Sequence, residues 1–201
     1  MPVCEKFPRI SKLRMYDITN DVYEKKAEMG APIQKDYTIG EVIVGDRKRV
    51  AIPIDKDTIG TFHSHTTPGL PEPSAVDVAE LLSHELELQC IGSTGYVKGP
   101  RVRCYTPSKN SNTIKERIRA LESQREKFRQ YLKEAYKGKK GKEVEAALSE
   151  KDYSEMVSRD RAMEKLIGDI NESKKKILEG CEIPPAGLGE VPAGAIGLRE
   201  E

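Results

Sequence analysis

Three potential metal ligands lie close together in the segment GTFHSHTTPGLPEPSAVDVAELL. His63 and His65 stand two residues apart at the end of an apolar run, TIGTFHSH (58–65), which we expect to be a strand. Because side chains two apart in a strand project from the same face, their imidazoles can converge on one ion. Asp77, near the start of a predicted helix, supplies a third ligand. Three such ligands leave a fourth tetrahedral position open, which is typical of a catalytic zinc site.

The same residues also have structural interpretations. A His-x-His pair at a strand end can be two polar side chains that face solvent. Ser74 and Asp77, in the order Ser-x-x-Asp, form a predicted capping box for a helix over 74–86. Capping and metal binding by Asp77 are compatible, because an aspartate in the first turn points out of the helix terminus. His84, at the charged end of this helix, is interpreted as a surface histidine.

The segment from His63 to Asp77 resembles the His-x-His…Ser-x-x-Asp signature of the JAMM (MPN+) zinc metalloproteases, a family of deubiquitinases and smaller archaeal desampylases. The resemblance covers roughly residues 10–107. Two departures are visible, since eight residues separate His65 from Ser74 where the family usually has seven, and a threonine follows His65 where proline is usual. A loop held between a strand and a helix can absorb one extra residue.

The resemblance implies a zinc-dependent isopeptidase or peptidase that cleaves a ubiquitin-like modifier or another flexible tail. His63, His65 and Asp77 would hold Zn²⁺, and Ser74 would donate a hydrogen bond to the oxyanion that develops on the scissile carbonyl. The family also uses a glutamate from an early strand, which takes the proton of the attacking water and delivers it to the leaving amine.

Two glutamates are candidates for this general base. Glu41 is the first, because it is the one charged residue inside the apolar run TIGEVIVG (38–45), and a carboxylate buried in a strand is costly unless it has a partner or a task. Aligning that run on its terminal glycine, as the family pattern would, puts Thr38 rather than Glu41 at the glutamate position. Glu28, at the end of the first predicted helix, is therefore an alternative, and a third possibility is that no base is present.

The elements around these residues predict an α+β fold, a sheet covered by helices. The resemblance implies that this sheet is mixed and JAMM-like (cytidine-deaminase-like). A first helix is expected over 21–29, capped by Thr19 or Asn20. Three β-branched runs then predict a meander, and the helix that comes after them leads into a hairpin. The expected strands are 38–45, 49–54, 58–65, 87–91 and 101–106.

Beyond residue 110 the apolar spacing changes to alternating steps of three and four, which is typical of long amphipathic helices. We expect an antiparallel helical hairpin with coiled-coil character over 111–180, appended to a metalloprotease domain over 1–107. The glycine- and proline-rich segment 181–201 is predicted to be a flexible tail. The hairpin would recognise substrate, form a homo-oligomer or bind a complex partner. A non-catalytic or weakly active JAMM-like scaffold that assembles a complex through this hairpin is the alternative function.

The composition of the chain says little about which molecules the protein binds. The 34 basic and 33 acidic residues leave a formal charge of +1, which implies no general attraction to nucleic acid or membrane. The expected partner is a protein substrate, and neither a membrane nor a nucleic acid is expected. The N-terminal residues MPVCEKFPRI lack the apolar run of a signal peptide, which favours a cytoplasmic location. The four cysteines are widely scattered without a Cys-x-x-Cys pair, so we interpret them as buried free thiols.

Overall fold

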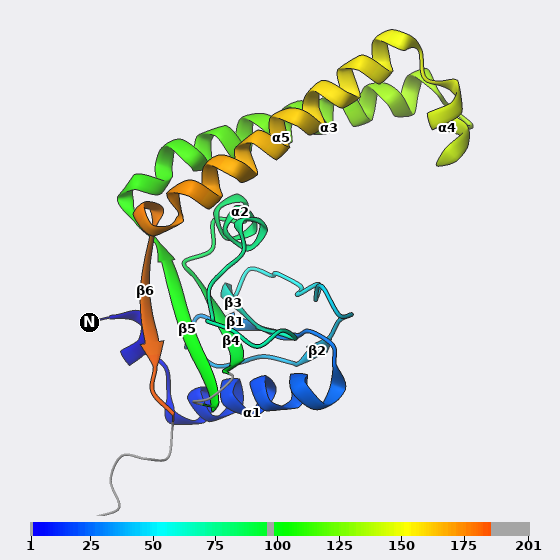
Figure 1. Cartoon of the computed structure of the whole chain (residues 1–201). Helices are drawn as coiled ribbons and strands as arrows, with labels where there is room; N and C mark the ends of the chain where they lie inside the picture. Colours follow the sequence, from blue (N-terminus) through cyan, green and yellow to red (C-terminus); the bar gives the residue numbers. More distant parts are fainter. Residues whose placement is uncertain (1, 96–98, 186–201) are drawn as a thin grey trace, which may run out of the picture. The chain divides into compact units, whose positions relative to one another are not determined.

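The computed structural model describes residues 2–95 and 99–185 (Figure 1). The chain forms two compact units. The first unit comprises the described residues up to Glu72, Leu86–Thr106 and the described residues from Glu179 onward. The second unit comprises Pro73–Glu85 and Pro107–Leu178. The unit boundaries thus divide the predicted metalloprotease domain at the helix that carries Asp77.

The first unit is built on a six-stranded mixed sheet with the order β2-β1-β3-β4-β5-β6. β3 and β4 pair in parallel, whereas the β1–β2, β1–β3 and β4–β5 pairs are antiparallel. The predicted combination of a mixed sheet and helices is confirmed. Its elements are η1 (Val3–Glu5), α1 (Arg9–Lys25), β1 (Met29–Gln34), β2 (Ile43–Val44), β3 (Thr58–His65), β4 (Leu88–Gly95), β5 (Gly99–Pro107) and β6 (Leu178–Ile183).

Helix α1 packs on one face of the sheet. Its buried side chains Ser11, Met15, Ile18 and Val22 recur at steps of four, three and four, which places them on one stripe of the helix. The helix ends at Lys26, which has a left-handed conformation with φ of 52°. The prediction of a helix over 21–29 was wrong in its bounds, because the polar residues near position 20 lie inside the helix and do not cap it.

The predicted meander is also wrong. The stretch 38–45 contributes the two residues of β2 and an isolated bridge from Ile39 to Ile33, and 49–54 forms no strand. The partner of β3 is instead β1, which contains Gly30 and Pro32, two residues that are disfavoured within strands. Pro32 is tolerated because its carbonyl accepts a hydrogen bond from Gly40, so its backbone nitrogen points away from β3 and no ladder bond is lost. A Cβ added at Gly30 would lie 2.8 Å from the carbonyl oxygen of Phe62, so only glycine fits there.

The second unit is helical. It contains α2 (Ala75–Ser83), η2 (Lys109–Ser111), α3 (Asn112–Ala135), α4 (Lys142–Ala147) and α5 (Glu150–Ile177). Helices α3 and α5 run antiparallel, because Arg117 pairs with Asp169 at 2.6 Å while Arg125, further along α3, lies 3.8 Å from Asp160. The apolar core of this unit joins α2 to both long helices through Val78, Leu82, Ile114, Ile118, Leu166, Ile170 and Ile177.

A buried aspartate fixes the start of α5. The Asp152 carboxylate accepts hydrogen bonds of 2.7 Å from the hydroxyls of Tyr136 and Ser149, and the Tyr136 bond is the main reason that the pKa of Asp152 is lowered. A carboxyl group whose pKa is lower in the folded than in the unfolded chain stabilises the fold above its unfolded pKa, about 3.9, and loses this contribution as the pH falls through the folded pKa.

We therefore expect Tyr136→Phe to lower the urea midpoint clearly at pH 7, and to lower it less and less as the pH falls below the unfolded pKa of Asp152. Tyr153→Phe, which changes an exposed tyrosine on the same helix as Asp152, is the matched control. An equal loss at every pH would show that Tyr136 acts by packing alone.

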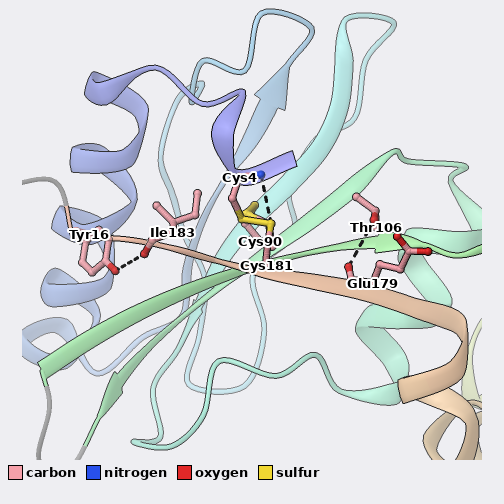
Figure 2. Close-up of a disulfide and its surroundings, with 8 residues drawn as sticks. Cys4, Tyr16, Cys90, Thr106, Glu179, Cys181 and Ile183 are labelled. Carbon is pink, nitrogen blue, oxygen red and sulfur yellow. Dashed lines mark hydrogen bonds between the residues drawn. A yellow bond between two sulfur atoms is a disulfide. The ribbon is translucent and has the colours of Figure 1, made fainter. Parts of the chain in front are cut away.

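The interpretation of the cysteines as free thiols is wrong in this structure. Cys4 of η1 is bonded to Cys181 of β6, and Cys90 of β4 is bonded to Cys104, its register partner on β5. Figure 2 shows that the Cys4 backbone N–H also points to the sulfur of Cys181, at 3.2 Å. Widely spaced cysteines meet here because the sheet brings distant segments together, which their spacing in the sequence does not reveal.

The predicted tail over 181–201 needs a second correction. Cys181–Ile183 belong to β6, where the Ile183 carbonyl accepts a 2.7 Å hydrogen bond from the hydroxyl of Tyr16 (Figure 2). Glu182 pairs with Arg101 of β5 through two hydrogen bonds of 2.9 and 2.8 Å. This segment is anchored because the Ile183 carbonyl has a partner on α1 and the Glu182 side chain has one on β5. The rest of the predicted tail, from residue 186, lies outside the described residues.

None of the helices in the described part of the chain combines the length and the apolar character needed to cross a bilayer.

Candidate metal centre

The two histidines lie at the end of β3, near the middle of the sheet. The predicted strand over 58–65 is confirmed, and its neighbours are β1 and β4, so that His63 is opposite Gly30 on one side and Ile91 on the other. His63 is buried with 6% exposure, whereas His65 is half-buried. A buried polar ring such as that of His63 is costly unless it is paired or ligated.

The ring nitrogens of the pair converge. The Nε2 atoms of His63 and His65 are 3.1 Å apart, and the ring centroids are 5.0 Å apart. In a tetrahedral zinc complex with Zn–N bonds of about 2.0–2.1 Å, two imidazole nitrogens lie roughly 3.3 Å from each other. The observed separation therefore suits two ligands on one ion.

The histidines face away from α1. Phe62 and Ser64 alternate with them along β3 and point to the opposite face. On that face, a Cβ added at Gly92 of β4 would overlap with Thr19 of α1 and lie 2.9 Å from the Ser64 hydroxyl. Helix α1 thus covers one face of the sheet, and the imidazoles occupy the other.

Asp77 begins helix α2 in the predicted capping box, which is confirmed. Its Oδ2 accepts a 2.7 Å hydrogen bond from the Ser74 N–H, and its own N–H donates to Ser74 Oγ at 3.1 Å. A carboxylate has about four acceptor positions, so the cap leaves acceptor capacity on Asp77 for a cation. Capping also fixes the direction of this side chain relative to the start of its helix.

Among the residues that the structure describes, one group of histidine, cysteine or acidic side chains could hold a metal ion. It consists of His63, His65 and Asp77, whose candidate ligand atoms all lie within 4.8 Å of one another. Two imidazoles and a carboxylate are a donor set that zinc accepts, and three protein ligands leave room for a further one. The residues present therefore fit a zinc ion.

Ser74 is exposed at the N-cap of α2. Because its Oγ already accepts the Asp77 N–H, the hydroxyl proton remains available to donate to another group. This is the direction of hydrogen bonding that an oxyanion requires. His84, at the C-cap of α2, is exposed, as predicted.

Glu28 immediately precedes β1. Its backbone N–H donates to the Asp46 carbonyl at 2.7 Å and its carbonyl accepts the Gly45 N–H at 2.8 Å, so its main chain is fixed. In the β1–β3 ladder Met29 is opposite Ser64 and Gly30 is opposite His63. Directly opposed residues of antiparallel strands share a face, and the face alternates along the strand. The register therefore puts the half-buried Glu28 in line with His65, on the face of both imidazoles.

Glu41 has a different environment. It is exposed and precedes the two-residue strand β2. Glu41 is therefore not the buried strand carboxylate that the sequence suggested, because the chain over 38–42 runs largely outside the sheet. Its role as a base has no geometric support beyond the sequence.

Sequence reasoning missed one feature beside this site. The turn Asp46–Arg49 connects directly to Glu28 and, through a 3.0 Å hydrogen bond from Thr66 Oγ1 to the Arg47 carbonyl, to the residue after His65. The signal for it in the sequence is the Gly-Asp pair at 45–46, which is typical of a turn and is followed here by three basic residues.

No protein-family model matches the chain, and searches of curated proteins and of solved structures found no match either. A function for this chain must therefore be argued from its fold and its donor set.

Proposed function

We propose that this protein is a zinc-dependent peptidase or isopeptidase of the JAMM type, which cleaves a ubiquitin-like modifier or another flexible protein tail. The observation that carries the proposal is the convergence of the His63 and His65 Nε2 atoms at 3.1 Å, in one group with the Asp77 carboxylate. The order of these residues in the chain supports it, because it resembles the signature of that family.

In this proposal His63, His65 and Asp77 hold the ion. Zinc, when bound, supplies Lewis acidity that activates a water molecule and polarises a carbonyl. Ser74 donates a hydrogen bond from its hydroxyl to the carbonyl oxygen as negative charge develops there, and it is oriented for this by the Asp77 N–H, which donates to its Oγ.

Glu28 is the proposed general base. It takes a proton from the attacking water and returns it to the leaving amine, a task that needs a carboxylate held on the face of the imidazoles. The hydrogen bonds of its main chain to Gly45 and Asp46 keep it at this position.

Metal analysis tests the site directly. We expect the purified protein to bind one zinc per chain and to lose cleavage of ubiquitin-like conjugates when a chelator removes the metal. His63→Ala and Asp77→Asn should each weaken zinc binding at least tenfold, because the first removes one of three ligands and the second replaces an anionic oxygen by a neutral amide oxygen. His84→Ala, which changes the exposed histidine at the end of α2, is the matched control and should keep full occupancy. A wild-type chain that stays free of metal after zinc addition would contradict the proposal.

A second candidate is a binding module without turnover. It is favoured by a cavity of about 170 Å³ on α3 and α5, where Arg159 lies 4.3 Å from the Phe128 ring centroid and the buried Nε of Arg159 has no hydrogen-bond partner. Such a surface suits a protein partner, or a second copy of the chain, that brings an apolar and an acidic group. Zinc binding without cleavage of any conjugate would support this candidate over the first.

The two disulfides bear on the cellular location of the protein. The prediction of a cytoplasmic protein must accommodate two disulfides, which persist in oxidising compartments and in the cytoplasm of hyperthermophiles. We propose that the protein is cytoplasmic, in a cell whose cytoplasm allows disulfides to persist.

A further inference from the structure

The turn Asp46–Arg49, which we call the basic turn, has a rigid backbone. The Asp46 carboxylate accepts the N–H groups of Lys48 at 2.7 Å and Arg49 at 3.0 Å, and the Asp46 N–H donates to the Arg49 carbonyl at 2.9 Å. A Cβ added at Gly45 would overlap with the backbone of Arg49, so glycine is required for the chain to approach itself this closely. The turn is therefore held by its backbone, and the side chains of Arg47, Lys48 and Arg49 are left exposed.

The basic turn is fastened to the candidate metal centre on two sides. The Thr66 hydroxyl donates to the Arg47 carbonyl at 3.0 Å, and Thr66 directly follows the proposed ligand His65. On the other side, the N–H of Glu28, the proposed base, donates to the Asp46 carbonyl at 2.7 Å. These bonds fix the turn at the border of the surface that a scissile bond would occupy.

The turn carries a net positive charge. It has three basic residues and one acidic residue, and its Asp46 remains ionised because the backbone N–H groups of Lys48 and Arg49 lower the pKa of its carboxyl group. Of the three bases, Arg49 has its Nε 3.8 Å from Oδ2 of this carboxylate, and Lys48 adds a smaller attraction. Arg47 and Lys48 project their charges into solvent next to the site.

We propose that the basic turn selects substrates with acidic residues beside the scissile bond; the inference rests on the proposed peptidase activity. A peptide whose carbonyl reaches the histidines places its neighbouring residues about 3.8 Å further along the chain per step. Charges interact over about 8 Å at physiological salt, so the charges of the basic turn act on peptide side chains within about two residue steps of the turn. Acidic side chains there are attracted to Arg47 and Lys48, and basic ones are repelled.

The test uses a library of peptides from a digested cell extract and the zinc-loaded full chain. Mass spectrometry identifies the cut sites, and one site is then remade as two fluorogenic peptides, one with Asp-Glu and one with Asn-Gln beside the scissile bond. We expect the acidic peptide to have a kcat/KM higher by about tenfold at low salt, with the preference falling as salt is added. In the double variant Arg47→Glu/Lys48→Glu the preference should disappear or invert.

The control is Arg9→Glu/Arg14→Glu, which makes the same charge change with two exposed residues of α1, on the opposite face of the sheet. It should retain the wild-type preference. Cleavage without a charge preference, or an equal effect of both double variants, would overturn the basic turn as a selector and leave the peptidase proposal standing. A zinc-loaded wild-type chain that cuts no peptide and no conjugate would overturn the peptidase proposal, and this inference with it.

Discussion

Glu28→Gln is expected to lower kcat by roughly 10²- to 10⁴-fold, the usual contribution of a general base, while the zinc content stays unchanged. The substitution replaces a carboxylate by an amide of the same shape, which cannot take a proton. The main-chain bonds of Glu28 to Gly45 and Asp46 do not depend on the side chain, so the strand register should persist. The measurement is a single-turnover cleavage assay on protein whose zinc content has been determined.

Glu41→Gln is the matched control, because it makes the same chemical change on an exposed glutamate outside the sheet. It should retain wild-type turnover. A large loss in Glu41→Gln with normal turnover in Glu28→Gln would reassign the base to Glu41. Normal turnover in both variants would show that neither carboxylate takes the proton.

Removal of the Cys4–Cys181 disulfide should have the largest effect on stability. The bond closes a loop with a sequence separation of 177 residues, whereas Cys90–Cys104 closes one of 14. The chain-entropy relation gives about 5 kcal/mol for the long loop and about 3 kcal/mol for the short one. Cys4→Ala/Cys181→Ala should therefore lower the free energy of unfolding more than Cys90→Ala/Cys104→Ala does, as measured by urea denaturation without reductant.

Alkylation followed by mass spectrometry provides the control. The native protein, unfolded without reductant, should take up no alkyl group, and the reduced protein should take up one on each of its four cysteines. Alkylation of all four without reduction would show that the thiols are free. The stability ranking would be contradicted if the short-loop pair proved the more costly to remove.

The local parts of the site could be predicted from the sequence. The β-branched run that ends in His63 and His65 and the capping box of Ser74 and Asp77 each depend on residues within a few positions of one another. Interactions of this range leave a direct mark in the order of residue types. Both elements have nearly the bounds that the sequence predicts.

The parts that depend on distant segments could not be predicted. β1 contains Gly30 and Pro32, so its composition argues against a strand, and its pairing with β3 and β2 stabilises it there. The placement of Glu28 is a consequence of that pairing. The assignment of Glu41 to a buried strand failed for the same reason, because hydrophobic sequence over 38–45 suggested burial that the tertiary structure does not provide.

The packing of α2 links the long helices α3 and α5 to the position of Asp77. This helix has nine residues, too few to be stable alone in water, and its buried side chains Val78 and Leu82 pack against α3 and α5. Helices α3 and α5 therefore stabilise the helix that carries Asp77. A shortened chain that joined β5 directly to β6 would leave that apolar face uncovered. Any recognition role of the long helices would accordingly be constrained, because mutations that loosen them would also loosen Asp77, a proposed metal ligand.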